Sequence, residues 1–576
     1  MDLSLDALIA RAEAWLIQDP DPDNAREVRE LIAARDQDGL TQRFSAELVF
    51  GTAGLRGFIG AGPNRMNRVT VGRASAGLAV QLAATVANAH DRGVVVGRDA
   101  RHKSLALAIQ TAETLVGAGF KVHWVPEPAP TPIVAFAGRY LNAAAAVVVT
   151  ASHNPPQYNG FKVYSERGSQ IVPPQDREIL SASRDAPPFK RLPKVDFETA
   201  LAGGSIQELA PAVEEAYYAA LDGQCMLSVP PPAALRVVTT SLHGVGNRPL
   251  LKALARRGFE DVTPVAAQAD PDPNFSTVTF PNPEEDGALD LALALARSEG
   301  ADILIANDPD ADRLCVAVAS GDGHRPLTGN ELGALLGDWL LGEAARRGTL
   351  PNASVVITTV VSSQLLGKIA TSYGVRSEAT LTGFKWIWDR AIALAEEGVE
   401  FRFGYEEALG YCVGQAVRDK DGISAAQVVC ELAAQLKAEG KSLLDALDAL
   451  WCRYGFHASG QVATTFPGLA GKAQIDALME RLRQQPPAEV LDTSILRIVD
   501  LLEDGSGLPR SNVLIWEMSD GARLVFRPSG TEPKLKAYVE VCVAVERGDT
   551  QAARESGLAR LAQIEDWIKD TIDRTS

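Results

Sequence analysis

A serine that is a candidate nucleophile lies in the segment 150–156, TASHNPP. This segment directly follows an apolar run that ends at Val149, and in open parallel sheets ligands bind beyond the carboxyl ends of the strands. His153 and Lys162 lie close enough in sequence to manage the proton of the Ser152 hydroxyl. The G-x-S-x-G pattern of acyl-transferring hydrolases is absent around Ser152, so a different chemistry is favoured. Taken alone, a serine before Asn-Pro is also a common turn residue.

A second segment, 307–313, places three aspartates at alternate positions. Its sequence is NDPDADR, and it also follows an apolar run. Alternate side chains of an extended segment point the same way, so Asp308, Asp310 and Asp312 can offer hard oxygen ligands to one divalent cation. An EF-hand calcium loop would need glycine at its sixth position and glutamate at its twelfth, where this chain has arginine and alanine, so magnesium fits better. A solvated acidic turn is the alternative, because three close carboxylates repel one another unless a cation joins them.

Two further segments carry side chains that can bind sugars and phosphates. In segment 403–410, FGYEEALG, the carboxylates of Glu406 and Glu407 can accept hydrogen bonds from vicinal sugar hydroxyls, although an acidic pair also suits the start of a helix. Segment 527–533, RPSGTEP, combines an arginine fork, two hydroxyls and a glycine that exposes backbone N–H groups, as a phosphate cradle requires. A tight turn would explain the serine and the glycine but not the arginine before them. The chain has no G-x-x-x-x-G-K-[ST] motif, which argues against a nucleotide-hydrolysing motor.

The composition is that of a globular protein. The chain has 576 residues, of which 46% are hydrophobic and 22% charged, and its net charge is −17. Such a charge disfavours nucleic acids and anionic membranes as partners, because both need a basic face. A phosphate ligand is compatible with it only if arginines and lysines gather at the site. The sequence shows neither a signal peptide nor an apolar run of about 20 residues, so we expect no membrane contact and a cytoplasmic location.

The pattern of apolar runs predicts several α/β domains in series. Between residues 68 and 150, and again between 236 and 359, helical segments alternate with short apolar runs, as in units that build a parallel sheet. The last third departs from this pattern, with strands at 523–527 and 537–543 and a closing amphipathic helix from about 551 to 572. We therefore expect several α/β domains in series, about four domains in all from the chain length, with a smaller α+β domain at the end.

In order and spacing, the four segments resemble the motifs of the α-D-phosphohexomutase superfamily, which includes phosphoglucomutase and phosphomannomutase. The matching motifs are T-A-S-H-N-P, D-P-D-A-D-R, G-Y-E-E-A-L-G and R-P-S-G-T-E-P, and the resemblance spans nearly the whole chain. It implies three consecutive mixed α/β domains, expected at 1–205, 206–326 and 327–455, and a C-terminal α+β domain, expected at 456–576. These four domains would surround a central active-site cleft, with one loop from each. It also implies a phosphosugar mutase, an isomerase that interconverts glucose 1-phosphate and glucose 6-phosphate through a phosphoserine and a sugar 1,6-bisphosphate. The cofactors that it implies are Mg²⁺ and glucose 1,6-bisphosphate, or the matching sugar bisphosphate, as activator, and the partner is a small-molecule sugar phosphate.

The resemblance also assigns roles to individual residues. The implied metal ligands are the phosphorylated Ser152, Asp308, Asp310 and Asp312. The candidate catalytic residues are then Ser152, His153, Lys162 as general base, and Arg56. The residues expected to bind substrate are Arg313, Thr382, Gly383, Lys385, Glu406, Glu407, Arg527, Ser529, Gly530 and Thr531. The cationic cluster that the net charge demands would consist of Arg56, Lys162, Arg313, Lys385 and Arg527.

One position departs from the phosphoglucomutase pattern. Where phosphoglucomutases commonly read G-E-E-S, this chain has Ala408, so one hydroxyl that could bind the sugar is missing. A neutral hydrogen bond contributes about 0.5–1.5 kcal/mol, so glucose phosphate remains a possible substrate with up to about tenfold lower affinity. Ala408 and the segment 240–246, TSLHGVG, look more like the branch with phosphopentomutase and glucose 1,6-bisphosphate synthase activities. Ribose, deoxyribose and mannose phosphates therefore stay as alternatives, and His243 is expected either to contact ligand phosphate or to cap the following helix.

Two other classes of function fit the sequence less well. A phosphatase of the haloacid-dehalogenase type also uses an aspartate-rich strand end, but its D-x-D-x-[TV] motif requires threonine or valine where Asp312 stands. A non-catalytic sugar-phosphate sensor on the same fold would have lost Ser152 or a metal aspartate, and all of them are present. The sequence leaves the oligomeric state open between monomer and dimer.

Overall fold

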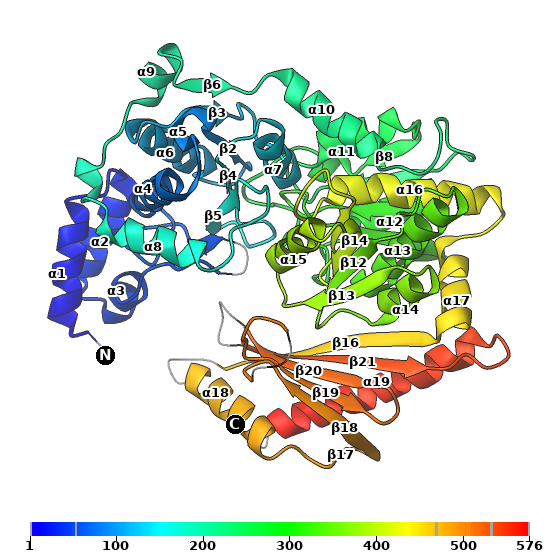
Figure 1. Cartoon of the computed structure of the whole chain (residues 1–576). Coiled ribbons are helices and arrows are strands. Elements are labelled where there is room, and N and C mark those ends of the chain that lie inside the picture. The colour runs from blue at the N-terminus through cyan, green and yellow to red at the C-terminus, as the bar shows by residue number, and fades with distance from the viewer. Residues whose placement is uncertain are drawn as a thin grey trace. The chain divides into compact units, whose positions relative to one another are not determined.

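The chain forms two compact units, which we describe separately. The computed structural model describes residues 3–51, 54–466, 471–503, 505, 507–529 and 534–573 (Figure 1). The first unit comprises Met1–Pro326 and Leu409–Ala434, and the second comprises Leu327–Ala408 and Gln435–Ser576. The first unit therefore contains a segment that lies far along the chain from the rest of it.

Three short helices precede the first sheet. They are α1 (Leu5–Leu16), α2 (Pro22–Ala33) and α3 (Gln37–Phe44). Each begins after an N-cap side chain, from Ser4, Asp21 and Asp36, that accepts a hydrogen bond from a backbone N–H of the first turn. Their apolar faces share one buried cluster that includes Leu8 and Phe44. An isolated helix cannot bury its apolar face, so packing of the three faces against one another stabilises these helices.

The first sheet has six strands in the order β1-β5-β4-β2-β3-β6. The strands are β1 (Leu55–Phe58), β2 (Val94–Arg98), β3 (Val122–Trp124), β4 (Ala145–Val149), β5 (Tyr158–Ser165) and β6 (Ile206–Glu208). The helices are α4 (Arg68–Thr85), α5 (Ala89–Arg92), α6 (Ser104–Gly117), α7 (Thr131–Tyr140), α8 (Gln175–Asp185), the 3-10 turn η1 (Phe189–Arg191) and α9 (Phe197–Ala202). The inner strands β2 and β4 are parallel and fully buried, which explains their continuous runs of valine and alanine. Strand β5 returns antiparallel to β4, so Lys162 lies opposite Val148.

The second sheet of the first unit has the order β11-β10-β9-β7-β8. Its strands are β7 (Val237–Thr240), β8 (Val262–Pro264), β9 (Ile303–Ala306), β10 (Cys315–Ser320) and β11 (Gly323–Pro326). The same unit holds α10 (Pro211–Asp222), α11 (Asn247–Arg256), the 3-10 turn η2 (Ala266–Gln268), α12 (Asp290–Glu299), β15 (Gly410–Val413) and the start of α16 (Gly422–Ala438). Strand β7 is parallel to β8 and β9, and β9 to β11 form an antiparallel meander. The aspartate-rich segment 307–313 thus follows a buried parallel strand, as predicted.

The second unit contains a parallel core followed by an antiparallel sheet. Strand β12 is parallel to β13 and β14, and the last sheet has the order β16-β21-β20-β19-β18-β17. The first part consists of α13 (Gly329–Arg346), β12 (Ser354–Thr359), α14 (Leu365–Ser372), β13 (Arg376–Thr380), α15 (Phe384–Glu396), β14 (Glu400–Glu406) and α17 (Leu443–Tyr454). The second consists of β16 (Phe456–Thr465), α18 (Gly471–Gln484), β17 (Glu489–Val490), β18 (Thr493–Asp500), β19 (Leu514–Met518), β20 (Arg523–Pro528), β21 (Lys534–Val543) and α19 (Thr550–Asp573).

The predicted fold class is confirmed. Three regions of mixed α/β structure precede a β-rich C-terminal region, on whose sheet α18 and α19 pack (Figure 1). The strands expected at 523–527 and 537–543 lie within β20 and β21. The domain edges given above remain predictions. Among the described residues, no helix is both long enough and apolar enough to cross a membrane.

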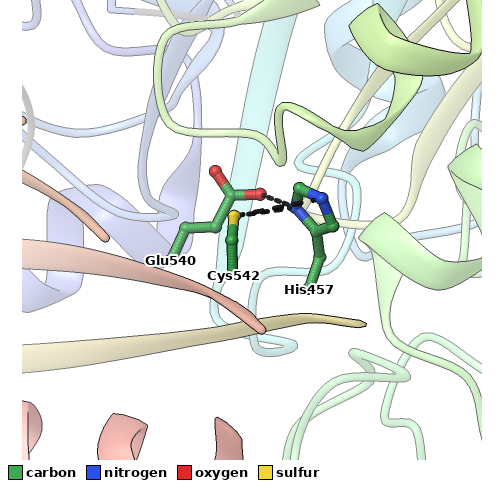
Figure 2. Close-up of side chains that lie close together, drawn as sticks. All are labelled: His457, Glu540 and Cys542. Carbon is green, nitrogen blue, oxygen red and sulfur yellow. Dashed lines mark hydrogen bonds and ion pairs between the residues drawn. The ribbon is translucent and has the colours of Figure 1, made fainter. Parts of the chain in front are cut away.

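Within the second unit, Glu540 joins the last sheet to the start of α14. Its carboxylate accepts hydrogen bonds from Ser363 Oγ at 2.5 Å and from the Gln364 backbone N–H at 2.9 Å. It also accepts a hydrogen bond from His457 Nδ1 at 2.9 Å (Figure 2). Lys368 Nζ lies 2.9 Å from His457 Nε2. Because an ammonium group can only donate hydrogen bonds, Nε2 accepts and the ring proton lies on Nδ1. Although His457, Glu540 and Cys542 are close enough to ligate a metal, Glu540 is already saturated by donors. We therefore assign this cluster a structural role.

Glu540→Gln is expected to destabilise the second unit by about 3 kcal/mol at neutral pH. Burial alone would raise the pKa of Glu540, but His457 and Arg523 lower it from 4.5 to about 2. Because the folded-state pKa lies below the unfolded one, the contribution is fully present above about pH 4.5 and is lost as the pH falls toward 2. The thermal midpoint of the variant should lie below that of wild type at neutral pH and approach it in acid. Glu517→Gln, in a half-exposed pair on β19, is the control and should change little, whereas equal midpoints for Glu540→Gln and wild type would contradict this assignment.

Candidate active site

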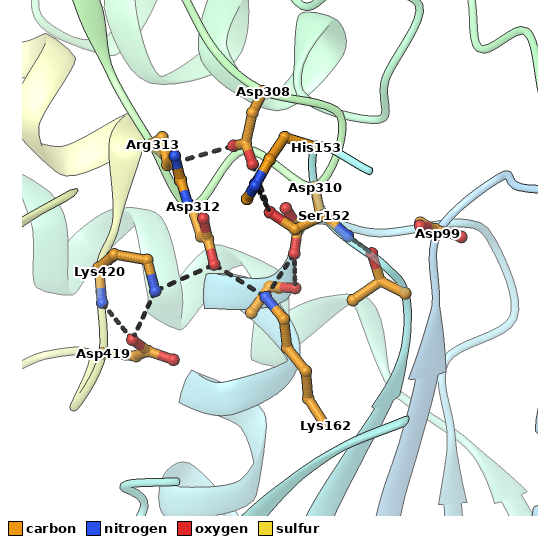
Figure 3. A network of polar contacts seen from close by, with 12 residues as sticks. Asp99, Ser152, His153, Lys162, Asp308, Asp310, Asp312, Arg313, Asp419 and Lys420 are labelled. Atoms are coloured by element: carbon orange, nitrogen blue, oxygen red, sulfur yellow. Dashed lines mark hydrogen bonds and ion pairs between the residues drawn. The ribbon is translucent and has the colours of Figure 1, made fainter. Parts of the chain in front are cut away.

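Ser152 lies directly beyond the buried end of β4 in an unusual backbone conformation. Its φ is +53°, in the left-handed region that a residue with a Cβ seldom adopts, and its N–H donates to Thr150 Oγ1 at 2.9 Å. The side chain is 1% exposed. Its Oγ donates a 2.6 Å hydrogen bond to Asp308 Oδ2 and lies 3.1 Å from His153 Nδ1 (Figure 3). The turn therefore presents the predicted nucleophile to a carboxylate from the second sheet.

His153 beside the serine is a neutral imidazole. Burial, and then the positive charges of Arg313 and Arg56, hold the pKa of His153 well below its usual range. A second proton on the ring would add positive charge where cations already gather. At neutral pH the uncharged ring can therefore hydrogen-bond the neighbouring Oγ.

The three predicted metal ligands converge in one buried cluster. One ligand oxygen from each of Asp308, Asp310 and Asp312 lies within 4.8 Å of the others, and each residue is at most 1% exposed. Burial, and then the charges of the other two aspartates, raise the pKa of Asp308 well above its usual range. Asp310 Oδ1 and Asp312 Oδ1 are buried and accept no hydrogen bond from the described part of the chain. Buried carboxylate oxygens without donors are costly unless a cation joins them, so this donor set fits a hard divalent cation.

Two lysines neutralise part of this negative charge. Lys162 Nζ lies 2.7 Å from Asp310 Oδ2 and 2.8 Å from Asp312 Oδ2, and Lys420 Nζ lies 3.2 Å from Asp312 Oδ2 (Figure 3). Burial alone would lower the pKa of Lys162, but Asp310 and Asp312 raise it above its usual value. Lys162 was predicted from the sequence, whereas Lys420 was not. In the sequence, Lys420 lies between two aspartates, and its ammonium is 3.1 Å from the carboxylate of one of them, Asp419.

Two predicted arginines surround the same site. Arg56 donates to Asn154 Oδ1 at 2.9 Å, which ties β1 to the serine loop. The Arg313 backbone N–H donates to Asp308 Oδ1 at 3.0 Å, and its guanidinium pairs with Glu284 at 3.1 Å. Arg56, Lys162 and Arg313 of the predicted cationic cluster therefore lie together in the first unit. Lys385 and Arg527 belong to the second unit.

In the second unit, hydrogen bonds from neighbouring loops hold the two glutamates of the segment 403–410, which is predicted to bind sugar. The Gly383 N–H donates to Glu406 Oε1 at 2.6 Å, and Ser362 Oγ donates to Glu407 Oε2 at 3.0 Å. Gly383 has φ +113°, a conformation that favours glycine, so the close approach of its N–H to Glu406 depends on that residue. Thr382, just before Gly383, lies in the loop that leads into α15. This loop and the end of β14 are thus held together by Glu406.

The residues predicted to bind phosphate are described only in part. Arg527 is the penultimate residue of β20, and the Ser529 N–H donates to the Lys534 carbonyl at 2.7 Å. Gly530 and Thr531 lie outside the described residues. Arg527 and Ser529 thus stand at the end of the strand from which the predicted phosphate loop departs.

His243 does not cap the helix that follows it. Helix α11 begins at Asn247 with Gly246 as N-cap, and no side chain caps it. The His243 ring instead lies 2.8 Å from Thr277 Oγ1, and its backbone carbonyl accepts from the Asp272 N–H. His243 therefore holds the segment 272–277, and its contact with a ligand phosphate remains a prediction.

Comparison with known families decides the identity of this site. Models of the α/β/α domains I, II and III of phosphoglucomutase/phosphomannomutase match residues 47–187, 215–321 and 328–454. The chain belongs to this family. It is thus a phosphosugar mutase of the α-D-phosphohexomutase superfamily, an isomerase that transfers a phosphoryl group.

Several curated proteins are similar to this mutase over most of their length. A Haemophilus influenzae protein named "Probable phosphomannomutase" is 40% identical and covers 82% of this chain and 93% of its own length. The glucose 1,6-bisphosphate synthase of Homo sapiens is 35% identical, covering 99% and 95%. The phosphopentomutase of Mus musculus is 35% identical, covering 96% and 92%. The relatives thus bear the names of several phosphosugar enzymes.

Solved structures share the fold of this mutase. A phosphoglucomutase/phosphomannomutase family protein from Burkholderia thailandensis superposes with a TM-score of 0.67 at 20% identity, covering 92% of this chain and 97% of that one. The phosphoglucomutase parafusin from Paramecium, in its open form, gives a TM-score of 0.66 at 16% identity, covering 92% and 96%. At such identities the likeness concerns the fold alone.

Proposed function

We propose that this mutase interconverts glucose 1-phosphate and glucose 6-phosphate through phosphorylated Ser152. The observation that carries the proposal is the buried Ser152 Oγ, which donates to Asp308. The charge of Asp308 and its two neighbouring aspartates is balanced by Lys162, Arg56 and Arg313. A phosphoryl group on this oxygen would lie among the cations that a −17 protein needs to hold it. The similarity to glucose 1,6-bisphosphate synthase and to phosphoglucomutase domains supports glucose as the sugar.

The proposed reaction consists of two phosphoryl transfers. In the first, the bond between phosphorus and Ser152 Oγ breaks, a bond to a free hydroxyl oxygen of the sugar monophosphate forms, and the hydroxyl proton passes to a base. The product is glucose 1,6-bisphosphate, which also serves as activator. In the second, the bond between the other phosphorus and its sugar oxygen breaks, and that phosphoryl group forms a new bond to Ser152 Oγ. The proton passes from the base to the released sugar oxygen, which leaves glucose 6-phosphate. The resemblance proposes Lys162 as the base, and His153 is the neutral group nearest the Oγ.

Asp308, Asp310 and Asp312 are proposed to hold Mg²⁺, together with the phosphoserine. Bound there, the ion supplies positive charge to the oxygens of the transferring phosphoryl group. The buried oxygens of Asp310 and Asp312 that accept no hydrogen bond from the described residues support this assignment. Glu406, Glu407 and Lys385 are proposed to bind the sugar phosphate, and Arg527 and Ser529 its distal phosphate.

A pentose phosphate is the second candidate substrate. It is favoured by Ala408, which lacks the hydroxyl of the G-E-E-S pattern, and by the relatives named phosphopentomutase and phosphoribomutase. The two candidates are separated by measuring kcat/KM with glucose 1-phosphate and with ribose 1-phosphate, in Mg²⁺ and a trace of the matching bisphosphate. A higher value for glucose 1-phosphate supports the proposal. A higher value for ribose 1-phosphate overturns it in favour of a phosphopentomutase.

Ala408→Ser is expected to raise kcat/KM for glucose 1-phosphate by up to about tenfold. The added hydroxyl restores one neutral hydrogen bond to the sugar, which contributes about 0.5–1.5 kcal/mol. Turnover of ribose 1-phosphate should change less, because a shorter sugar offers fewer hydroxyls. Ala408→Cys has a similar size but a weak donor, so it is the control and should stay near wild type. An equal gain for both variants would show that side-chain size, not the hydroxyl, matters.

A further inference from the structure

Arg101 lies just beyond the end of β2 and binds the backbone of the serine loop, residues 152–158. It lies in the connection between β2 and α6 and is 4% exposed. One terminal nitrogen donates to the carbonyls of Pro155 at 2.9 Å and Tyr158 at 3.3 Å. The other donates to the carbonyl of Ser152 at 2.5 Å and to that of Asn154. A single guanidinium thus binds four backbone carbonyls of the segment 152–158.

The guanidinium itself is fixed from two sides. Asp99, which is 2% exposed, pairs with Arg101 Nε at 3.3 Å and also accepts from the Arg101 N–H and from Ser104 Oγ. The Phe275 ring, from a loop after β8, lies against the guanidinium with 4.8 Å between centroid and carbon. Arg101 therefore has little freedom to leave the serine loop.

We propose that Arg101 is a positioning residue that holds Ser152 in the geometry required for phosphoryl transfer, an inference that rests on the proposed function. Ser152 is held at φ +53°, which its own side chain disfavours, so the conformation depends on surrounding bonds. Arg101 bonds the carbonyl of Ser152 itself, while Asp308 receives its Oγ. Loss of the hydrogen bonds from Arg101 would let the Ser152 Oγ move away from the position that in-line phosphoryl transfer requires. It would not remove any group that is proposed to bind the sugar.

The role of Arg101 requires its planar fork and not just its charge. Lysine keeps the positive charge but offers donors from one point, so it cannot reach four carbonyls at once. Apart from Arg313, the residues expected to bind the sugar phosphate belong to the second unit. Arg101→Lys is therefore expected to lower kcat by about a hundredfold and to leave KM for the sugar phosphate within about threefold of wild type.

Arg98 provides a matched control. It is also buried, ends β2, stacks on Trp124, and binds the backbone carbonyls of Val125 and Pro126 but none in the serine loop. Arg98→Lys should therefore keep kcat within about twofold of wild type, unlike Arg101→Lys. Phe275→Leu, which keeps the Arg101 guanidinium and removes only its aromatic support, should lower kcat in the same direction but less.

The test measures kcat, KM, thermal midpoint and phosphorylation of Ser152 by glucose 1,6-bisphosphate in each variant. Selective loss of kcat and slower phosphorylation in Arg101→Lys support the proposal, and if that variant fails to fold, the Phe275→Leu result decides. A folded Arg101→Lys enzyme with wild-type kcat overturns the proposal. An equal loss of kcat in Arg98→Lys also overturns it. If Arg101→Lys does not fold, unchanged kcat in Phe275→Leu overturns it. Failure of wild type to convert any sugar phosphate would instead refute the proposed function.

Discussion

Ser152→Ala is expected to reduce mutase turnover by about 10⁴-fold or more. The alanine has no oxygen to carry the phosphoryl group, and none of the proposed roles of the neighbouring groups replaces that oxygen. The measurement is conversion of glucose 1-phosphate in the presence of Mg²⁺ and glucose 1,6-bisphosphate. The variant should remain folded, because the lost hydroxyl makes one hydrogen bond to Asp308.

Ser165→Ala is the matched control for this prediction. Ser165 ends β5 and its Oγ donates to the Ser169 carbonyl at 3.2 Å, away from the aspartates. Its turnover should match that of wild type. Near-normal turnover in Ser152→Ala would contradict the assignment of Ser152 as the residue that carries the phosphoryl group.

Removal of divalent cations is expected to lower turnover by about a thousandfold or more, and Mg²⁺ should restore it. Three buried carboxylates can share one site only when cations balance them, and two of their oxygens accept no hydrogen bond from the described residues. The measurement is turnover after dialysis against EDTA, followed by stepwise addition of Mg²⁺. Binding of Mn²⁺, followed by its electron spin resonance signal, provides a readout that does not depend on turnover.

Asp310→Asn should weaken Mn²⁺ binding and turnover together. Asp322→Asn changes an exposed aspartate at the turn between β10 and β11 and should affect neither. Full activity in EDTA would refute the metal site. Unchanged Mn²⁺ binding in Asp310→Asn would place the cation elsewhere.

The residues that could be predicted from the sequence are those carried by short motifs. Ser152 and Asp308 each follow a buried strand, and parallel strands bring such loops to one edge of their sheet. The 2.6 Å hydrogen bond from Ser152 Oγ to Asp308 Oδ2 joins two different sheets. Only the resemblance of the motifs predicted that these two residues meet, because neither local pattern indicates it. Lys162 lies next to β4 because β5 returns antiparallel, which the alternation of apolar residues does not reveal.

The residues that were not predicted reach the site through tertiary contacts, so their local sequence says little about their role. Arg101 binds backbone carbonyls, which every residue possesses, so no partner side chain marks its role. Lys420 comes from the segment Leu409–Ala434, which groups with the first unit although its neighbours in sequence belong to the second. That grouping depends on contacts such as the Tyr217–Asp421 hydrogen bond and the Arg257–Glu431 ion pair, which join distant parts of the chain.

The most direct test follows the phosphoryl group itself. The protein is incubated with Mg²⁺ and glucose 1,6-bisphosphate, separated from excess ligand, and analysed by peptide mass spectrometry before and after glucose 1-phosphate is added. We predict one phosphoryl group on Ser152 that disappears on addition of the sugar phosphate as glucose 1,6-bisphosphate forms. A phosphoryl group on another residue, or continued turnover with Ser152 never phosphorylated, would contradict the mechanism.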